Sequence, residues 1–536
     1  MTSMAGCADD GPSQNKAWLA CLVAAHAALL LVAVWHNRGS FGPDAIPYMR
    51  IAGYYASGDT ALMISGYWGP LISWLMAPLI RLGVPALTAA WTIMFISAIG
   101  LLLSCVLLFR RLRLPPAGQS LASTLVAIVS VGWCASDAIT PDLLLCTFIL
   151  FAIARTISAP WLSSTRYQAG TGLVWSIAYF SKAVAFPLAF LITAGIACFW
   201  WLTRSTRLLP LMRAAAVTLT AFLICALPWL TVLSIKYHRP TFSVTLVVNH
   251  GGVGPGVDPG DIRISTFQMF HTPAPGRISS WEDPTSLPYP MWSAFQSLPN
   301  ALHQLKLIEV NALFELATIR NFDLLGFGFV SLIVGTALVW VGREHAGGVE
   351  PWQWCIAPLL AVLLIYLPNY GASSRYYYLA YIFLLAASVG LANWISGRVT
   401  PSPALMRRML YVAIAASFSI GMLPEVWAAV HKEARWQQTI ARARARADQL
   451  RSEGIVGPVA GGAVDGVYLS YSLSQPFHGS VPMASMHDFD GLKGKVKLLL
   501  VERNNPAIDM LRTDANYREL EPTHSSDTVL FELLSP

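Results

Sequence analysis

Five charged residues stand out in this chain because each lies at the end of an otherwise apolar stretch. The acidic members are Asp44, Asp137 and Asp142, and the basic members are Lys182 and Arg375. A carboxylate can accept a proton from a hydroxyl or orient a nucleophile, and an ammonium or guanidinium group can stabilise the charge that develops on a phosphate leaving group. Together these residue types would suit group transfer from a phosphate, provided that the fold gathers them.

The three acidic residues also have structural interpretations. Asp44 could cap a helix that we expect at Ile46–Tyr55, a role that aspartate commonly fills. Thr140, Pro141 and Asp142 are the residue types that begin a helix, with Asp142 near its positive end. Asp137 is not explained in this way, and both acids of the pair could point into one outer cavity.

The two basic residues break the charge pattern of their surroundings. Lys182 interrupts an apolar hairpin and has no acidic neighbour in sequence, so it either extends to lipid headgroups or binds a phosphate. Arg375 can bind phosphate bidentately. The tyrosines that follow it, Tyr376 first, could belong to an interfacial aromatic belt.

Composition decides what kind of protein must position these residues. The chain has 536 residues, of which 55% are hydrophobic and 12% are charged. Soluble proteins carry about 25% charged residues, so this is an α-helical polytopic membrane protein. We predict about eleven spans, from runs of roughly 20 apolar residues. They are 17–35, 86–109, 119–136, 140–158, 169–181, 184–202, 214–235, 322–342, 353–368, 376–396 and 409–430.

Clustered arginines predict the orientation of these spans. They lie in loops Arg110–Arg113, Arg204–Arg213 and Arg398–Arg408, which all fall on one side when the spans are counted from a cytoplasmic N-terminus. Positive charge near span ends marks the cytoplasmic face, so the five isolated charges lie on the outer face. The same topology accounts for the net charge of +7 without a nucleic-acid partner.

Three outer regions remain, and they define the predicted domains. Loop 36–85 and insert 236–320 belong to a transmembrane domain of residues 1–430. Residues 431–536 form a small extracytoplasmic α/β region. It opens with a basic helix, Arg435 to Arg451, followed by β-like runs at Gly466–Leu473, Val496–Glu502 and Thr528–Leu534.

The insert contains aromatic and acidic motifs, Trp281-Glu282-Asp283-Pro284 and Pro288-Tyr289-Pro290-Met291-Trp292. Such residues grip sugars, but Trp and Pro also stabilise loops that lie on membranes. The histidines of the insert are too scattered to predict a metal site.

At this point the outer motifs resemble those of the GT-C glycosyltransferases, in particular the branch of protein mannosyltransferases and the lipid A aminoarabinose transferase (glycosyltransferase family 39). Loop 1, the Thr140-Pro141-Asp142 turn, the Gly172–Lys182 hairpin and the Arg375-Tyr376 turn occur in the family's order. The resemblance covers roughly 17–400 and implies a GT-C-like fold. The motif positions in loop 1 include Asp44, Tyr48, Ser57-Gly58-Asp59, Pro70-Leu71 and Trp74.

The resemblance implies an inverting transfer of a sugar from a polyprenyl-phosphate donor to a lipid, glycan or protein acceptor of the cell envelope. Asp44 would be the catalytic carboxylate, with Asp142 and Asp137 in support. Lys182 and Arg375 would bind the donor phosphate, with Tyr48 and Tyr376 beside the substrate. The protein would lie in the bacterial inner membrane, among its lipids, with its active site facing the periplasm.

One position departs from the family pattern. Many relatives have an acidic pair in loop 1, whereas the second position here is Ala45. The base or metal-assisting role of that pair is therefore open: a divalent cation is one candidate cofactor, but the sequence assigns no metal ligands. Two other functions remain alternatives, an O-antigen ligase or polymerase and a lipid-linked saccharide transporter.

Overall fold

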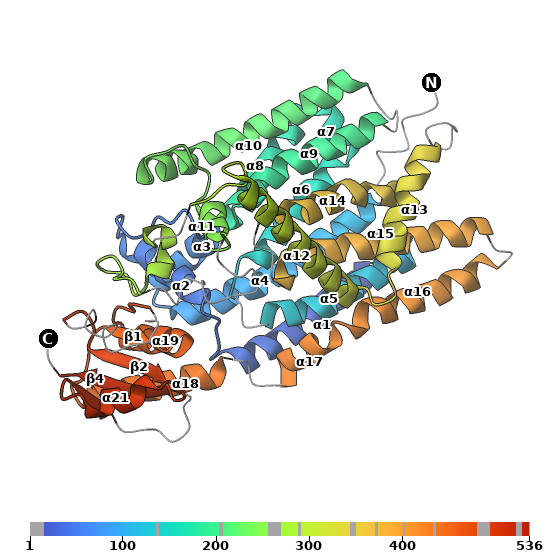
Figure 1. Cartoon of the computed structure of the whole chain (residues 1–536). Coiled ribbons are helices and arrows are strands. Elements are labelled where there is room, and N and C mark those ends of the chain that lie inside the picture. Colours follow the sequence, from blue (N-terminus) through green and yellow to red (C-terminus); the bar gives the residue numbers. More distant parts are fainter. Residues whose placement is uncertain are drawn as a thin grey trace.

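The structure is a computed structural model of the full chain, and the statements below concern the residues that it describes. These residues are 16–135, 139–202, 207–255, 270–287, 291–342, 350–369, 373–399, 402–431, 436–479, 492, 494–520 and 528–534. A bundle of apolar helices makes up most of them, and a small sheet region lies at one end (Figure 1). The prediction of a helical membrane protein with a small C-terminal α/β region is confirmed.

Six described segments are long and apolar enough to cross a membrane. They are α1 (Lys16–Asn37), α4 (Ala86–Arg111), α5 (Pro116–Ala135), α9 (Ala185–Leu202), α10 (Leu208–Lys236) and the segment Ser374–Arg398, which contains η6 (Ser374–Tyr377) and most of α15 (Tyr378–Val399). Two bent pairs raise the number of candidate spans to eight. One joins α12 (Leu298–Phe322) and α13 (Phe327–Gly342) at 108°, and the other joins α16 (Pro403–Ile420) and α17 (Leu423–His431) at 54°.

Shorter helices occupy the remaining predicted runs. They are α6 (Asp142–Thr156), α8 (Thr165–Ser181) and α14 (Ile356–Tyr366), which follows η5 (Pro351–Cys355). Each of the eleven apolar runs therefore contains a helix, although these three are shorter than the roughly 20 residues that cross a bilayer unaided. Within the bundle α8 packs closely along α10, where a Cβ on Gly172 would lie 2.3 Å from the carbonyl oxygen of Thr218.

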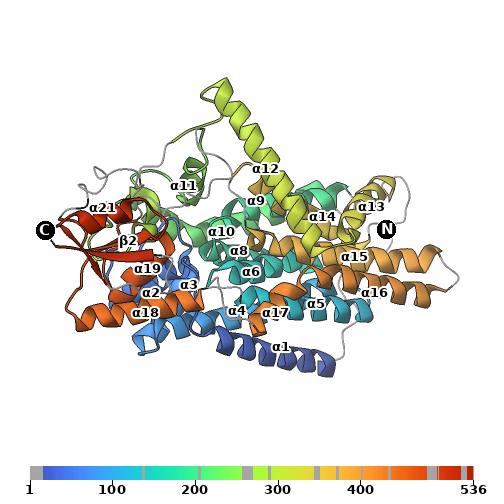
Figure 2. The same cartoon turned by 60° about the horizontal axis from the view of Figure 1, so that its bottom comes forward.

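One end of the bundle carries most of the irregular structure. There lie α2 (Ala45–Ser57), α3 (Pro70–Arg81), α11 (Thr245–Gly251) and the C-terminal sheet, whereas the N-terminal end of α1 and the α15–α16 connection lie at the opposite end (Figures 1 and 2). The helix predicted at Ile46–Tyr55 is present as α2. Short helices complete this part of the chain: α7 (Ala159–Ser163), η3 (Ser280–Glu282) and η4 (Pro284–Ser286).

The C-terminal region contains a four-stranded sheet in the order β1-β2-β4-β3. The strands are β1 (Val459–Gly461), β2 (Leu498–Glu502), β3 (Tyr517–Leu520) and β4 (Thr528–Leu533), and the helices are α18 (Gln437–Ser452), α19 (Ala463–Leu473) and α21 (Ala507–Thr513). Strand β1 pairs with β2 in parallel, and the other two pairings are antiparallel.

The predicted strands Val496–Glu502 and Thr528–Leu534 are confirmed as β2 and β4, and the basic helix is confirmed as α18. The strand predicted at Gly466–Leu473 is wrong, because these residues belong to helix α19. Gly461 and Gly462 both have positive φ, 80° and 56°, and they turn the chain out of β1 into this helix. Tyr468 of α19 is buried and donates a hydrogen bond to the carbonyl oxygen of Phe41 at 2.6 Å. Tertiary packing therefore outweighs the local strand preference of this segment.

Candidate active site

Asp44 lies immediately before α2, at the position of a helix cap, but it does not act as one. Its side chain makes no capping hydrogen bond. Instead its Oδ2 accepts a hydrogen bond from Nη2 of Arg375 at 2.7 Å. The capping interpretation is therefore wrong, and the carboxylate is committed to a contact 331 residues away in sequence.

Asp142 begins helix α6, and its carboxylate has a partner on each oxygen. Oδ1 accepts from Nζ of Lys182 at 2.6 Å, and Oδ2 accepts from the hydroxyl of Thr140 at 2.8 Å. The cap residue of α6 is Pro141, so Thr140 holds the carboxylate instead of capping the helix. The amino end of α6 adds a positive potential at the same place.

Arg375 joins the two halves of this site. Its Nη2 binds Asp44, and its Nε lies 3.7 Å from Oδ2 of Asp142. We call Asp44, Arg375, Asp142 and Lys182 the outer charge cluster, after the face on which the sequence predicts them. The Asp142 side chain is 4% exposed, whereas those of Lys182, Arg375 and Asp44 are 22–25% exposed. The cluster therefore consists of one buried carboxylate, Asp142, and three side chains that solvent can reach.

Two predicted tyrosines belong to this site as well. The Nζ of Lys182 lies 4.1 Å from the ring centre of Tyr376, which stacks on Tyr366 with centroids 5.2 Å apart. An aromatic face at this distance stabilises a cation. Tyr48 is buried on α2, and burial raises the pKa of its hydroxyl well above the usual range, with the Asp142 and Asp44 carboxylates acting in the same direction. Tyr48 is therefore a neutral hydroxyl beside the cluster.

Close backbone contact positions the Lys182 turn. A Cβ on Gly69 would lie 2.1 Å from the carbonyl oxygen of Ser181, so only glycine fits here. Gly69 precedes α3, and Lys182 ends α8. Loop 1 thus contacts the hairpin through a glycine that had no assigned role in the sequence.

Six of the seven predicted site residues are gathered around the cluster, namely Asp44, Asp142, Lys182, Arg375, Tyr376 and Tyr48. The seventh, Asp137, lies outside the described residues. Sequence reasoning did not select Thr140 or Tyr366 for the site. The proximity of Thr140 to Asp142 in sequence was the only signal, and nothing in the sequence pointed to Tyr366.

A divalent cation does not fit the cluster as it stands. Ala45 is fully buried where an acid would be needed, Oδ2 of Asp44 is paired with Arg375, and the two oxygens of Asp142 are paired with Lys182 and Thr140. Among the described residues no group of three or more His, Cys, Asp or Glu side chains is arranged to hold a metal. We derive no step through a metal.

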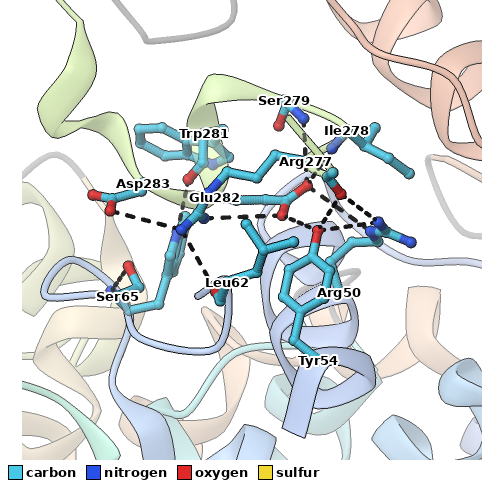
Figure 3. A network of polar contacts seen from close by, with 12 residues as sticks. Arg50, Tyr54, Leu62, Ser65, Arg277, Ile278, Ser279, Trp281, Glu282 and Asp283 are labelled. Atoms are coloured by element: carbon cyan, nitrogen blue, oxygen red, sulfur yellow. Dashed lines mark hydrogen bonds and ion pairs between the residues drawn. The ribbon is translucent and has the colours of Figure 1, made fainter. Parts of the chain in front are cut away.

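A second group of charges surrounds Glu282, a carboxylate that is sealed from solvent (Figure 3). Glu282 is 0% exposed and accepts hydrogen bonds from the Tyr54 hydroxyl at 2.7 Å and the Ile278 backbone N–H at 2.8 Å. Arg277 is 6% exposed and lies 4.0 Å from Glu282, and Arg50 lies 3.9 Å from it. We call Arg50, Tyr54, Arg277 and Glu282 the buried network.

The buried network shows that the Trp281-Glu282-Asp283 motif stabilises the loop. Glu282 holds the insert against α2 and is too deeply buried to contact a sugar. Asp283 pairs with Lys236 at the end of α10 at 2.5 Å, and Trp68 donates to the carbonyl oxygen of Trp281 at 2.8 Å. The motif is therefore structural, whereas Pro288–Pro290 of the second motif lie outside the described residues.

Comparisons with known proteins add the fold relationship. No family model matches the chain, and no curated protein matches it. Among solved structures it is similar to ArnT from Cupriavidus metallidurans bound to undecaprenyl phosphate, with a TM-score of 0.56 and 14% identity over 96% of this chain and 98% of the other. It is also similar to the oligosaccharyltransferase AglB from Archaeoglobus fulgidus in complex with an inhibitory peptide and a dolichol-phosphate, with a TM-score of 0.55 and 11% identity over 90% and 69%.

A third similar structure is the mycobacterial arabinofuranosyltransferase AftD, with a TM-score of 0.52 and 13% identity. The match covers 98% of this chain and 42% of AftD. All three relatives are GT-C enzymes. The chain is thus a multi-pass membrane protein with the fold of the GT-C glycosyltransferases, as its outer motifs indicated.

Proposed function

We propose that this protein is an inverting glycosyltransferase that moves a sugar from a polyprenyl-phosphate donor to a lipid, glycan or protein of the cell envelope. The observation that carries the proposal is the outer charge cluster. Two carboxylates and two cations from four distant segments meet there, and three of the four side chains remain partly exposed. The similar ArnT and AglB structures, with their bound polyprenyl phosphates, support the donor class.

In this proposal the donor phosphate binds to Lys182 and Arg375. The Arg375 side chain is 23% exposed, and its Nε makes no hydrogen bond among the described residues, although it lies 3.7 Å from Oδ2 of Asp142. Both cations are aligned by carboxylates before any ligand arrives. Preorganised charges of this kind stabilise the negative charge that grows on a leaving phosphate.

The acceptor oxygen attacks the anomeric carbon from the face opposite the phosphate. The new carbon–oxygen bond forms as the bond to the phosphate oxygen breaks, which inverts the configuration and releases the polyprenyl phosphate. Asp44 is the more exposed carboxylate, and it accepts the proton of an acceptor hydroxyl. An acceptor that is already ionised needs only orientation by Asp44, which is consistent with the lack of a second acid at Ala45.

We place the active site and the C-terminal region on the periplasmic side of a bacterial inner membrane. The support is charge asymmetry. Helix α4 ends in Arg110 and Arg111, and α16 carries Arg407 and Arg408 near its start, on the side of the bundle away from α2. Arginines near span ends mark the cytoplasmic face.

The decisive experiment measures sugar transfer by the purified full chain with a panel of polyprenyl-phosphate sugars and envelope acceptors. Asp44→Asn keeps the shape of the side chain and should lower transfer on the order of 10²- to 10⁴-fold, because the base is lost. Glu309→Gln is the control, since Glu309 is an exposed acid on α12. Full activity of Asp44→Asn would overturn the assignment.

Two further measurements separate the alternatives. Mass analysis of surface glycans in a strain without the protein should show loss of a single sugar. Accumulated carrier that still bears its glycan would favour a ligase, and build-up of the lipid-linked sugar on the cytoplasmic side would favour a transporter. Transfer assayed in EDTA, and after adding back Mg²⁺ or Mn²⁺, decides the cation requirement.

A further inference from the structure

A cavity of about 810 Å³ lies between α2 and the C-terminal region, and no residue of the outer charge cluster lines it. Its volume falls within the range of sites that hold small molecules, roughly 300–1,000 Å³. One wall is a face of α2 that includes Met49, Arg50 and Ser57, and the opposite wall includes Arg444 and Arg451 of α18. Helices far apart in sequence thus enclose a space that neither would form alone.

Guanidinium groups converge on this cavity from both walls. Arg50 donates through Nη2 to the Tyr54 hydroxyl at 3.0 Å and to the carbonyl oxygen of Gly276 at 3.2 Å, and Glu282 lies behind it. Arg444 lines the cavity from α18, and Tyr471 lines it from α19. The buried network therefore holds Arg50 in place and leaves its Nη1 for a ligand.

Acidic residues on the cavity wall offset only part of this charge. Asp448 is paired with Arg451 at 2.7 Å, and Arg451 also donates to the carbonyl oxygen of Ser472. Asp59 lies on the wall as well. Within the described part of the chain, Arg444 is exposed and makes no ion pair, so it is the cation most ready to bind an anion.

The cavity borders the start of a candidate membrane span. Ile80 from the last turn of α3 and Ala86 from the first turn of α4 both line it, and α4 is a candidate span. Leu82, between these helices, is 81% exposed. A ligand here would have its polar group among the arginines and its apolar part against the bilayer edge.

We infer that this cavity binds the phosphate-bearing headgroup of a membrane amphiphile, at a site separate from the outer charge cluster. Arginine binds phosphate through paired N–H donors, and Arg50 and Arg444 supply such donors from opposite walls. The Ser57 and Tyr471 hydroxyls add further hydrogen-bonding capacity. This inference concerns binding and holds whether or not the proposed sugar transfer is correct.

The test titrates the detergent-purified full chain with dihexanoyl phosphatidic acid, read out by microscale thermophoresis. Wild type should show saturable binding. Arg444→Gln should weaken it about tenfold, the value of one charge-assisted hydrogen bond. Arg442→Gln is the matched control, because Arg442 lies on the same helix, is exposed and does not line the cavity. An equal loss of affinity in both variants would mean that binding depends only on general surface charge, and it would overturn the site.

Two further ligands identify the source of the phosphate. Dihexanoyl phosphatidylcholine should bind at least tenfold more weakly, and comparable binding would contradict a basic site. Inorganic phosphate should compete poorly, and competition as strong as that of phosphatidic acid would overturn the lipid assignment. Asp44→Asn should bind phosphatidic acid like wild type, so a failed transferase assay and a failed binding assay remain distinguishable.

Discussion

The outer charge cluster and the buried network contain similar charged residues but differ in their access to solvent. The outer charge cluster joins two carboxylates to arginine and lysine, and the buried network joins one carboxylate to two arginines, in both cases across segments that are distant in sequence. In the outer charge cluster, Lys182 and Arg375 remain 22–23% exposed. In the buried network the Glu282–Arg277 pair is 0% and 5% exposed at the side chain, and Arg50 at the edge of the network is 30% exposed. Ion pairs that solvent and substrate can reach are suited to catalysis. The buried Glu282–Arg277 pair is suited to holding the insert against α2.

The difference also lies in how each carboxylate is satisfied. Glu282 accepts hydrogen bonds from Tyr54 and from the Ile278 and Ser279 backbone, which leaves no place for a ligand. Asp44 has one hydrogen-bond donor, Arg375, among the described residues. Loss of Glu282 should therefore affect folding, and loss of a cation from the outer charge cluster should affect turnover.

The largest effect on stability is expected from Glu282→Ala. It leaves Arg277 and Arg50 without their shared carboxylate, and breaking a buried ion pair from one side costs about 3–5 kcal/mol. The thermal unfolding midpoint of the detergent-purified protein measures this, with Glu309→Ala as the exposed control. An unchanged midpoint would show that the insert is held to α2 by other contacts.

Arg375→Gln should lower turnover strongly and change the unfolding midpoint little. Removing one preorganised charge from a developing anion costs about 10²- to 10³-fold in turnover. The unfolding midpoint should change much less than in Glu282→Ala, because Arg375 is partly exposed. A loss of stability as large as that of Glu282→Ala would mean that the outer charge cluster is structural too.

Gly69→Ala tests whether a close backbone contact positions Lys182 of the outer charge cluster for catalysis. The added methyl group would collide with the carbonyl oxygen of Ser181 and displace the Lys182 turn. A misplacement of about 1 Å near reacting groups can cost up to about 100-fold in rate. Turnover should fall by at least tenfold, and Gly39→Ala, where a Cβ meets only open space and the backbone is not in the left-handed region, controls for chain stiffening. Wild-type turnover in Gly69→Ala would separate this contact from catalysis.

The smallest effect is expected from pH at His478. Phe477 forms an isolated β-bridge with Ser279, which precedes Glu282 of the buried network. Burial lowers the pKa of the neighbouring His478 to about 4, and Lys495 and His271 act in the same direction. The folded state resists protonation that the unfolded chain accepts near pH 6.5, so stability should fall as pH decreases from about 6.5 to about 4. His478→Gln should flatten part of this decline in unfolding midpoint, and an identical pH profile would exclude His478 as its source.

Much of the architecture followed from the sequence. Apolar runs and arginine loops predicted a polytopic helical protein with one chemically active face, because bilayer thickness and charge asymmetry act on local sequence. The conversion of Gly466–Leu473 from an expected strand into α19 depended on burial of Tyr468 against Phe41, a contact across 427 residues. Local propensity carries no information about such a partner.

For the site, the sequence by itself determined which residues were chemically unusual: Asp44, Asp142, Lys182 and Arg375. Only the tertiary structure decided that these four residues form one connected group of ion pairs, whereas the chemically similar Glu282 and Arg277 are buried. The physical reason is that side-chain type sets what a charge can do, whereas burial and partner geometry set whether a substrate can reach it. Those quantities arise from packing between distant segments.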